Sequence, residues 1–308
     1  MTSRPVRRVL VIRLGGLREF VLAFPAFSAI RHHHPEAHLI LLTTAPFREI
    51  AKKSGWFDEI WDDGRPRWSR PGKVWALVRR LRRSGVDLVY DLENSDRTAR
   101  YRMLMSDVWG NKAPWSRSVA DAGAGMRVHL VEQYVRQLAE AGITEPVLPD
   151  LSWLSTGFGG RFGLTDGYVL MAPGGSADWP ERRWPVDRYA DLARRIGIEG
   201  RRPVLVGTAA DAEVNRRIAA ASPEAMDLTG RTSLFDLAAL AGHAGVAVGN
   251  NNGAMHLIAA VGCPAVVLFA DESDVKRMAP RGHYVVPVRK GDLAALPVTE
   301  VAAAMRLR

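Results

Sequence analysis

The sequence predicts an α/β protein made of two halves, each built on a parallel sheet, and three observations carry this prediction. Short apolar, β-branched runs alternate with helical patterns along the chain, as in proteins with parallel sheets. Residues 143–166 interrupt the alternation, which then restarts, and they read as a linker rich in proline and glycine. A glycine-bearing turn follows the first strand of each half, at Gly15 and Gly16 and again at Gly174 and Gly175.

These observations together define the predicted architecture. We expect two Rossmann-like domains, over residues 1–150 and 151–308, with a last helix that could pack back on the first domain. Ligands of such sheets bind outside the carboxyl ends of the strands. The two parallel sheets are therefore expected to face a central cleft.

The elements of the first half follow from its periodicities. Apolar runs predict strands over residues 6–12, 39–43, 59–61 and 86–90. Helical spacing predicts helices over residues 19–32, 47–54, 73–83, 98–105 and 128–141. The helix over 73–83 is amphipathic, because its apolar positions share one face while four arginines fall elsewhere.

The second half repeats this pattern. It predicts strands over residues 168–172, 203–206, 246–248 and 265–269. Helices are predicted over residues 186–196, 211–221, 234–241, 254–261 and 298–307. Thr232 and Ser233 supply a capping signal for the helix that follows them.

Composition narrows the class of protein. The chain has 308 residues, of which 47% are hydrophobic, but its longest apolar runs are too short to cross a bilayer. The basic residues 1–8 lead directly into a strand, unlike a signal peptide. Cys263 is the single cysteine, so no internal disulfide is possible and a reducing cytoplasm is expected.

The net charge of +9 lies mostly in the first half, where 24 Lys and Arg residues stand against 17 Asp and Glu residues. Such an excess fits an anionic substrate, an anionic membrane surface or nucleic acid, but it also fits a merely solvated arginine-rich surface. Because no nucleic-acid-binding module is recognisable, we expect no nucleic-acid partner.

Residues 246–269 carry the most chemical information. An apolar strand enters a turn with Asn250, Asn251 and Asn252, and a short helix and a second apolar strand follow. Such a turn places backbone N–H groups and a positive helix end at the carboxyl edge of a sheet, where anions bind. Side-chain amides donate and accept hydrogen bonds without charge, so phosphate or sugar hydroxyls fit there.

Cofactors and metals are not expected. Neither glycine turn matches the G-x-G-x-x-G fingerprint of NAD or FAD sites. Three adjacent histidines, His32 to His34, cannot share one helical face, and no neighbouring Cys or carboxylate set completes a metal site.

Four segments, in the right order, resemble the ADP-heptose:lipopolysaccharide heptosyltransferases of glycosyltransferase family 9, which have the GT-B fold. The first is residues 9–22 (VLVIRLGGLREFVL) with 24–26 (FPA). The second is residues 173–176 (PGGS) with 182–185 (RRWP), and the third is residues 204–207 (VLVG) with 211–213 (DAE). The fourth is residues 246–269, similar to the family's V-G-x-D-[ST]-G-x-x-H segment.

The resemblance implies inverting, metal-independent transfer of a heptose from ADP-heptose to an acceptor hydroxyl. Such a displacement needs a general base on one face and positive partners for the departing diphosphate on the other. Glu19 stands where the family has its catalytic aspartate, and Arg18 beside it could form an ion pair with it. Glu19 could instead be a carboxylate that only stabilises a helix N-terminus.

The resemblance also assigns donor and acceptor residues. Arg182 replaces the family's diphosphate-binding lysine, and Asn251 replaces an aspartate that contacts the donor sugar. His256 matches a family histidine, although a core or capping histidine is the alternative. The full donor set is Gly175, Ser176, Arg182, Glu213, Thr232, Asn251, Asn252, Gly253 and His256, and the acceptor set is Arg13, Gly15, Gly16 and Arg18.

Two further hypotheses remain open beside this enzyme. One is a catalytically impaired relative that binds nucleotide or glycan in a regulatory or scaffolding role, because three functional positions are substituted. The other is an active enzyme with a different donor. For the heptosyltransferase hypothesis, the expected partners are a nucleotide sugar and an anionic glycan or glycolipid of the lipopolysaccharide core. The enzyme could also associate peripherally with the inner membrane, where the helix over 73–83 could contact the lipid surface.

Overall fold

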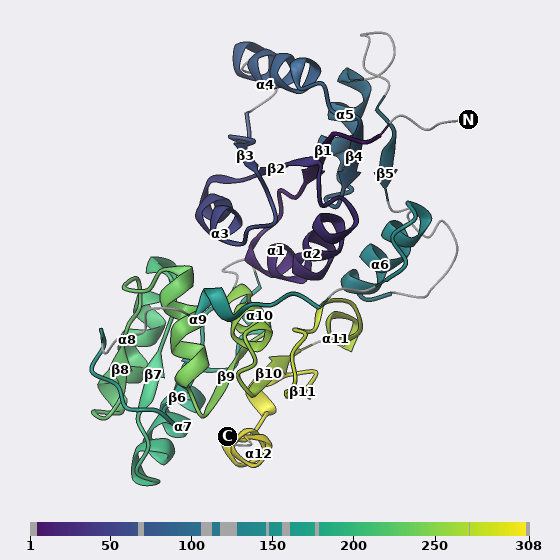
Figure 1. The fold of residues 1–308 in the computed structure, drawn as a ribbon. Helices are drawn as coiled ribbons and strands as arrows, with labels where there is room; N and C mark the ends of the chain where they lie inside the picture. The colour runs from purple at the N-terminus through teal and green to yellow at the C-terminus, as the bar shows by residue number, and fades with distance from the viewer. Residues whose placement is uncertain are drawn as a thin grey trace. The chain divides into compact units, whose positions relative to one another are not determined.

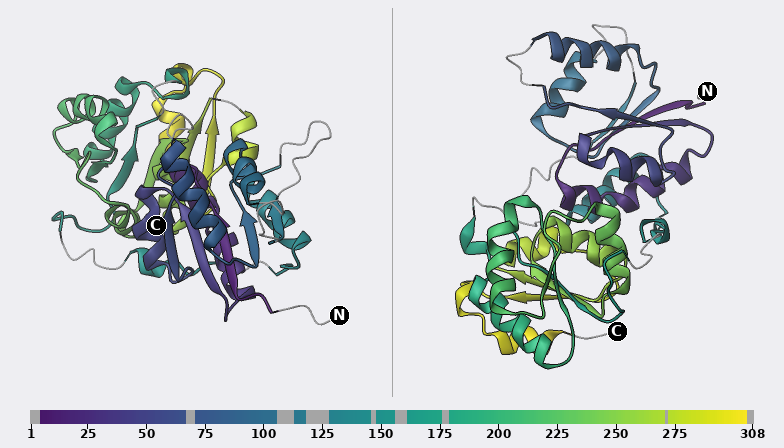
Figure 2. Two further views of the ribbon diagram at one scale, coloured as in Figure 1. Left: turned by 90° about the horizontal axis from the view of Figure 1, so that it is seen from above. Right: turned by 90° about the vertical axis from the view of Figure 1, so that its left-hand side faces the viewer.

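The chain divides into two compact units, Met1–Pro149 and Asp150–Arg308, one residue before the predicted division (Figure 1). The computed structural model describes residues 5–66, 71–105, 113–117, 128–145, 148–155, 161–175, 179–270 and 272–305. Each unit carries one parallel sheet with helices on both faces (Figure 2). Within the described ranges, no helix has the length and apolar character that a bilayer crossing requires.

The N-terminal unit contains a five-stranded sheet in the order β3-β2-β1-β4-β5. Its strands are β1 (Arg8–Ile12), β2 (His38–Thr43), β3 (Glu59–Asp62), β4 (Leu88–Asp91) and β5 (Trp115–Arg117). All four pairings are parallel, and the central strand ends beside both neighbours, with Ile12 opposite Leu42 and Asp91. The residues that follow these strands therefore emerge at one edge.

The helices of this unit follow the predicted order with one difference. They are α1 (Leu17–Leu22), α2 (Phe24–His33), α3 (Arg48–Lys53), α4 (Pro71–Arg83), α5 (Asp96–Leu104) and α6 (Leu130–Glu140). The single helix expected over 19–32 is divided at Ala23, which ends α1 and begins α2. Pro25 explains the division, because proline has no N–H to continue the hydrogen bonding of α1.

Both faces of the N-terminal sheet are buried, which is why its central strands read as continuous apolar runs. Leu10 and Ile12 face one core together with Leu77 and Leu81 of α4 and Tyr101 of α5. The alternate residues of β1 are equally buried. Helices α1 and α2 carry a cluster of packed phenylalanine rings, whose members are Phe20, Phe24 and Phe27.

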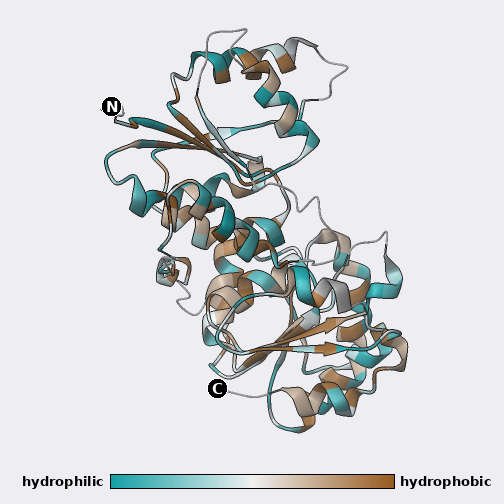
Figure 3. Ribbon diagram, turned by 90° about the vertical axis from the view of Figure 1, so that its right-hand side faces the viewer, coloured by the Kyte–Doolittle hydropathy of each residue, from teal (hydrophilic) through white to brown (hydrophobic). Residues whose placement is uncertain are grey.

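The C-terminal unit contains a six-stranded parallel sheet in the order β11-β10-β9-β6-β7-β8. Its strands are β6 (Val169–Ala172), β7 (Pro203–Leu205), β8 (Met226–Asp227), β9 (Val246–Asn250), β10 (Ala265–Phe269) and β11 (Val285–Arg289). Its helices are α7 (Val186–Ile198), α8 (Ala212–Ala221), α9 (Leu234–His243), α10 (Gly253–Ala260), α11 (Glu272–Met278) and α12 (Val298–Ala304). The central strands of this sheet are strongly hydrophobic, as Figure 3 shows.

Trp184 lies at the centre of the C-terminal core. Its side chain is fully buried, packs edge-on against Tyr189 at 4.8 Å and donates its indole N–H to the Leu296 carbonyl at 3.0 Å. Val301 of α12 joins the same core, and α12 packs against α7 and β11. The last helix, which we expected could pack back on the first domain, thus contributes to the core of its own unit.

His34, one of the three adjacent histidines, has a structural place in the N-terminal unit. Its Nε2 lies 2.9 Å from the Tyr90 hydroxyl. Burial, together with the neighbouring charges of His33 and Arg31, lowers the pKa of His34 to about 4. The folded chain therefore favours neutral His34, whereas the unfolded chain protonates it near pH 6.5.

This difference predicts a pH-dependent contribution to stability. The contribution of His34 is fully present above about pH 6.5 and is lost as the pH falls from there towards 4. The difference in unfolding free energy between the wild type and His34→Gln should therefore shrink between pH 7.5 and pH 4.5, measured by urea denaturation. A difference for His34→Gln that stays constant over this pH range would contradict the assignment.

Candidate functional site

Three turns meet at the carboxyl edge of the C-terminal sheet. They follow β6 (residues 173–175), β7 (residues 206–211) and β9 (residues 251–252). A Cβ atom on Gly174 would clash with the carboxylate of Asp211, and one on Gly249 would lie 2.7 Å from the Ala172 carbonyl. Glycine is thus required at position 249, where the neighbour is backbone, whereas a side chain at position 174 would displace the Asp211 carboxylate.

The three consecutive asparagines have separate tasks. Asn252 caps α10, because its Oδ1 accepts the Met255 N–H at 3.1 Å. Its Nδ2 donates to the carbonyls of Ala172 and Gly174 at 3.0 and 2.8 Å. The side chain of Asn252, a residue of the predicted donor set, therefore makes its hydrogen bonds within the protein itself.

The side chain of Asn250 also makes its hydrogen bonds within the protein. Of the three asparagines, only Asn251 has a side-chain N–H group left to donate. Asn250 is 2% exposed and bonds to four groups of the same unit. Asn251 has its Oδ1 3.3 Å from Nε2 of His256. Within the described part of the chain, the Nδ2 of Asn251 makes no hydrogen bond, so it remains able to donate to a ligand.

His256 lies in the first turns of α10 and is 1% exposed. Its contact with Asn251 joins the two residues that the family pattern separates by five positions. A buried imidazole that contacts the Asn251 amide fits a structural histidine of the core. It fits equally a histidine that orients Asn251 for a ligand. The role of His256 as a donor-binding residue stays a prediction.

Two adjacent arginines differ in their contacts. Arg182 is exposed, and its guanidinium lies 4.7 Å from the centre of the Trp179 ring. Arg183 donates from Nη2 to the Gly175 carbonyl at 2.6 Å. Arg183 was not among the predicted residues, because it occupies a variable position of the family pattern. Ser176 lies outside the described residues.

Two further residues of the predicted donor set, Glu213 and Thr232, lie beyond the carboxyl ends of β7 and β8 and differ in accessibility. Glu213 is exposed and forms an ion pair with Arg216 at 2.8 Å. Thr232 is partly buried and directly precedes Ser233, the residue that caps α9. Asp211 is the carboxylate that contacts the glycine turn, and the sequence analysis gave it no role.

The predicted base lies at the carboxyl edge of the N-terminal sheet. Glu19 occupies the first turn of α1, and its Oε1 accepts the Nε–H of Arg18 at 3.1 Å. This is the ion pair that the sequence suggested. A Cβ atom on Gly16 would lie 3.2 Å from Oε2 of Glu19, and one on Gly15 would lie 3.1 Å from its Cβ, so both glycines leave room for the carboxylate.

The loop that leads to Glu19 is clamped at Leu14. The Leu14 N–H donates to Glu93 at 2.9 Å, and its carbonyl accepts from Arg65 at 2.5 Å. Arg13, expected to bind acceptor, is 4% exposed and donates to the Leu92 carbonyl at 2.7 Å, with Glu93 3.2 Å away. Glu93 and Arg65 were missed, because nothing in the sequence shows that three strand ends converge on the backbone of one residue.

Two buried carboxylates lie at the same edge. Burial raises the pKa of Asp63 and that of Asp91. Asp63 accepts the Tyr101 hydroxyl at 2.5 Å, and Asp91 lies 3.3 Å from Nε of Arg117. Among the described residues, no three His, Cys, Asp or Glu side chains gather as a metal site requires.

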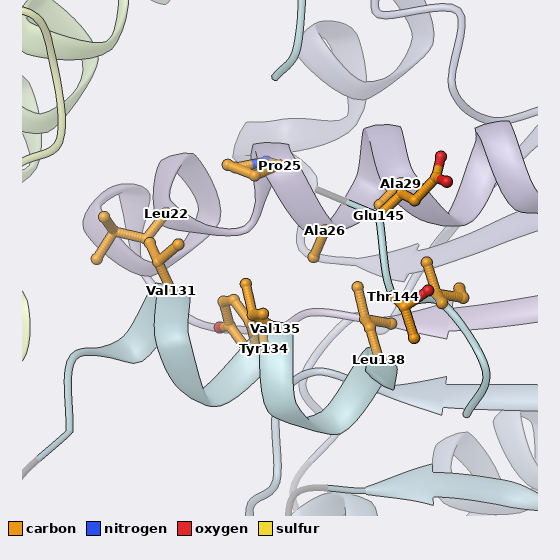
Figure 4. A pocket seen from close by; sticks show the side chains of 11 residues that line it. Leu22, Pro25, Ala26, Ala29, Val131, Tyr134, Val135, Leu138, Thr144 and Glu145 are labelled. Carbon is orange, nitrogen blue, oxygen red and sulfur yellow. The ribbon is translucent and has the colours of Figure 1, made fainter. Parts of the chain in front are cut away.

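A separate groove runs between α2 and α6 of the N-terminal unit (Figure 4). Its walls are mostly aliphatic, with Leu22, Pro25 and Ala26 on one side and Val131 and Leu138 on the other. The described lining holds Tyr134, Thr144 and Glu145 as its polar side chains and no basic residue for a phosphate, so it suits a nucleotide poorly. The donor residues predicted from sequence lie in the other unit.

The tasks of Asn252 predict a graded effect of substitution. Asn252→Ala removes the cap of α10 and both tethers, so the unfolding free energy should fall by about 1–2 kcal/mol. Asn252→Ser keeps an oxygen for the cap and should lose less. Urea denaturation checks this order, and equal losses for the two variants would show that the cap contributes nothing.

The chain is similar in sequence to known glycosyltransferases. The family model for "Glycosyltransferase family 9 (heptosyltransferase)" matches residues 99–303. The lipopolysaccharide heptosyltransferase 2 of Escherichia coli (strain K12) is 35% identical over 131 residues, which make up 37% of this chain and 37% of that protein. The match thus spans little more than a third of the length of this curated relative.

Solved structures extend the likeness to almost the whole chain. A family 9 glycosyltransferase from Veillonella parvula DSM 2008 has a TM-score of 0.81 at 20% identity, covering 98% of this chain and 97% of that one. The E. coli ADP-heptose lps heptosyltransferase II has a TM-score of 0.77 at 21% identity, covering 96% and 97%. These likenesses confirm the predicted α/β fold of GT-B type.

The family model covers well over half of the chain, including every turn described at the carboxyl edge of the C-terminal sheet. The chain belongs to glycosyltransferase family 9.

Proposed function

We propose that this protein is an inverting glycosyltransferase that moves a heptose, or a related sugar, from an ADP-sugar to a hydroxyl of an anionic glycan of the lipopolysaccharide-core type. The observation that carries the proposal is the family match over residues 99–303. The names of the relatives above, a lipopolysaccharide heptosyltransferase and an ADP-heptose lps heptosyltransferase, support the donor and acceptor classes.

The C-terminal unit supplies the groups for the donor in this proposal. The exposed guanidinium of Arg182 is placed to attract the diphosphate, for which arginine offers a two-pronged donor geometry. The backbone N–H groups at Gly253 add the positive end of α10. The available amide of Asn251 serves the sugar hydroxyls, and Gly175, Ser176, Glu213, Thr232 and His256 remain further donor candidates.

The N-terminal unit supplies the base. In the proposed step the acceptor oxygen forms a bond to the anomeric carbon while the bond from that carbon to the diphosphate breaks. Glu19 takes the acceptor proton, and ADP leaves with the bonding electron pair. We propose that Arg182, rather than a metal ion, balances the negative charge that grows on the diphosphate.

One observation favours a second candidate, a relative that binds nucleotide or glycan without catalysing transfer. Glu19 is ion-paired with Arg18 through Oε1 at 3.1 Å, so one of its two carboxylate oxygens is already engaged within the protein. Asn251 also lacks the charge of the family's aspartate. Both features would be tolerated in a protein that only binds.

Replacing the proposed base separates the two candidates. Glu19→Gln removes the proton acceptor but keeps the shape of the side chain, so the transfer rate should fall by at least about 100-fold. Affinity for ADP, measured by calorimetry, should stay within about twofold, because Glu19 belongs to the other unit. Glu49→Gln, an exposed position on α3, is the matched control for loss of one carboxylate.

Full transfer activity of Glu19→Gln would exclude Glu19 as the base. A wild type that binds ADP yet transfers no sugar to any core glycan would instead support the non-catalytic candidate.

We further propose that the protein works in the cytoplasm and associates peripherally with an anionic membrane that carries its acceptor. Residues 65–86 hold eight Lys and Arg residues and no Asp or Glu. In α4 the apolar residues Leu77 and Leu81 are buried, whereas Arg79 and Arg83 are exposed and Trp75 is 58% exposed. These exposed arginines can bind anionic lipid headgroups, and tryptophan is enriched at the boundary between headgroups and water.

Charge reversal tests this association. Each arginine near an anionic surface contributes about 1 kcal/mol, so Arg79→Glu with Arg83→Glu should weaken binding to phosphatidylglycerol vesicles by at least about 25-fold in co-sedimentation. Arg216→Glu with Arg217→Glu makes the same charge change on α8 and should bind as the wild type does. Equal binding by both double variants would contradict a role for α4.

A further inference from the structure

Asn250 occupies the last position of β9, and its buried side chain joins three segments of the C-terminal unit. Its Oδ1 accepts the backbone N–H of Trp184 at 3.0 Å and the hydroxyl of Tyr189 at 3.1 Å. Its Nδ2 donates to the carbonyls of Pro173 and Gly174 at 2.6 and 3.4 Å. All four hydrogen-bonding positions of the amide are used.

The chemistry of the partners fixes the orientation of this amide. The backbone N–H of Trp184 can only donate, so Oδ1 must face it. The Pro173 carbonyl can only accept, so Nδ2 must face that side. Only an uncharged group with two acceptor sites and two donor protons satisfies both sides, which excludes aspartate in its ionised form and every aliphatic residue.

The segments that Asn250 joins are the ones proposed to hold the donor. On one side lies the glycine turn, where the Gly175 carbonyl is held by Arg183. On the other side lies Trp184, which directly follows Arg182 and Arg183 in the chain. Because the two sides share one buried amide, a change at Asn250 moves the turn and the arginine segment relative to each other.

We infer that Asn250 is a positioning residue that sets the geometry of the diphosphate site by coupling the glycine turn to the arginine segment. The inference rests on the proposed donor function of this edge, and it assigns a task that the family motif does not give to this position. Small displacements of groups that bind a reacting ligand have large effects, about 100-fold for 1 Å. Asn250 therefore acts on the donor without touching it.

Two tyrosines of the same unit provide a matched test. Tyr189→Phe removes one bond to Asn250, whereas Tyr168→Phe removes a comparable buried bond, from its hydroxyl to the Leu240 carbonyl at 2.7 Å. Both variants should lower Tm by a similar amount. Only Tyr189→Phe should weaken ADP binding, by about fivefold, as expected for one hydrogen bond, measured by calorimetry on the full chain. Equal effects of the two variants on ADP affinity would overturn the inference.

Asn250→Asp gives a signature that simple destabilisation would not produce. At pH 8 its carboxylate faces the Pro173 and Gly174 carbonyls, so ADP affinity relative to the wild type should fall by at least about 20-fold, in line with an uncompensated buried charge. A protonated carboxyl group can again donate to the Pro173 carbonyl, so the ratio should recover at least partly at pH 5.5. A variant with wild-type affinity at pH 8, or a ratio that is independent of pH, would overturn the inference.

Hydrogen exchange separates this inference from the proposed function. Peptides that contain residues 173–175 and peptides that contain residues 184–189 should both exchange faster in Asn250→Asp than in Tyr168→Phe, without any ligand. Faster exchange in only one of the two segments would overturn the coupling. A wild type that does not bind ADP at all would contradict the proposed donor while leaving the coupling supported by this measurement.

Discussion

Both sheets depend on one constraint, which is that polar groups at the ends of buried parallel strands must find partners. The strands are covered on both faces, so side chains along them are apolar and polar residues gather where the strands end. Backbone N–H and C=O groups just beyond the last strand pairing need other hydrogen-bond partners. An unpaired buried group lowers the free energy of unfolding by about 1–3 kcal/mol. In the N-terminal unit Glu93 and Arg65 satisfy the backbone N–H and carbonyl of Leu14, and in the C-terminal unit two asparagines satisfy the carbonyls of residues 172–174.

The same constraint explains why the candidate donor edge carries so many uncharged polar groups. A carboxylate at position 250 or 252 would face backbone carbonyls, which are poor neighbours for a negative charge. Asn251 is free of that requirement, and it is the position at which the family has an aspartate. The loss of charge thus falls at the one asparagine of the three whose Nδ2 makes no hydrogen bond among the described residues, whereas the side chains of its two neighbours bond to the protein itself.

Much of the fold could be predicted from sequence, and the exceptions have physical causes. Continuous apolar runs identified β1, β2, β6 and β10, because these strands are buried on both faces. The strands β5 and β8 were missed, since they are only three and two residues long and have no apolar run. The strand β11 contains Pro287, which argues against a strand except at an edge. At the site, single residues such as Glu19 and Asn251 could be placed by motif, but Asn250, Arg183 and Glu93 act through contacts between distant segments that no local pattern encodes.

The edges of the two sheets have a consequence for the behaviour of the protein in concentrated solution. An exposed edge strand is a template on which another chain can add a strand. Here the edge strands are β3 and β5 in one sheet and β8 and β11 in the other, and three of them have four residues or fewer. The fourth, β11, carries a proline, which lacks a donor for such pairing. Both sheets are thus protected against edge-to-edge aggregation by the brevity or composition of their outermost strands.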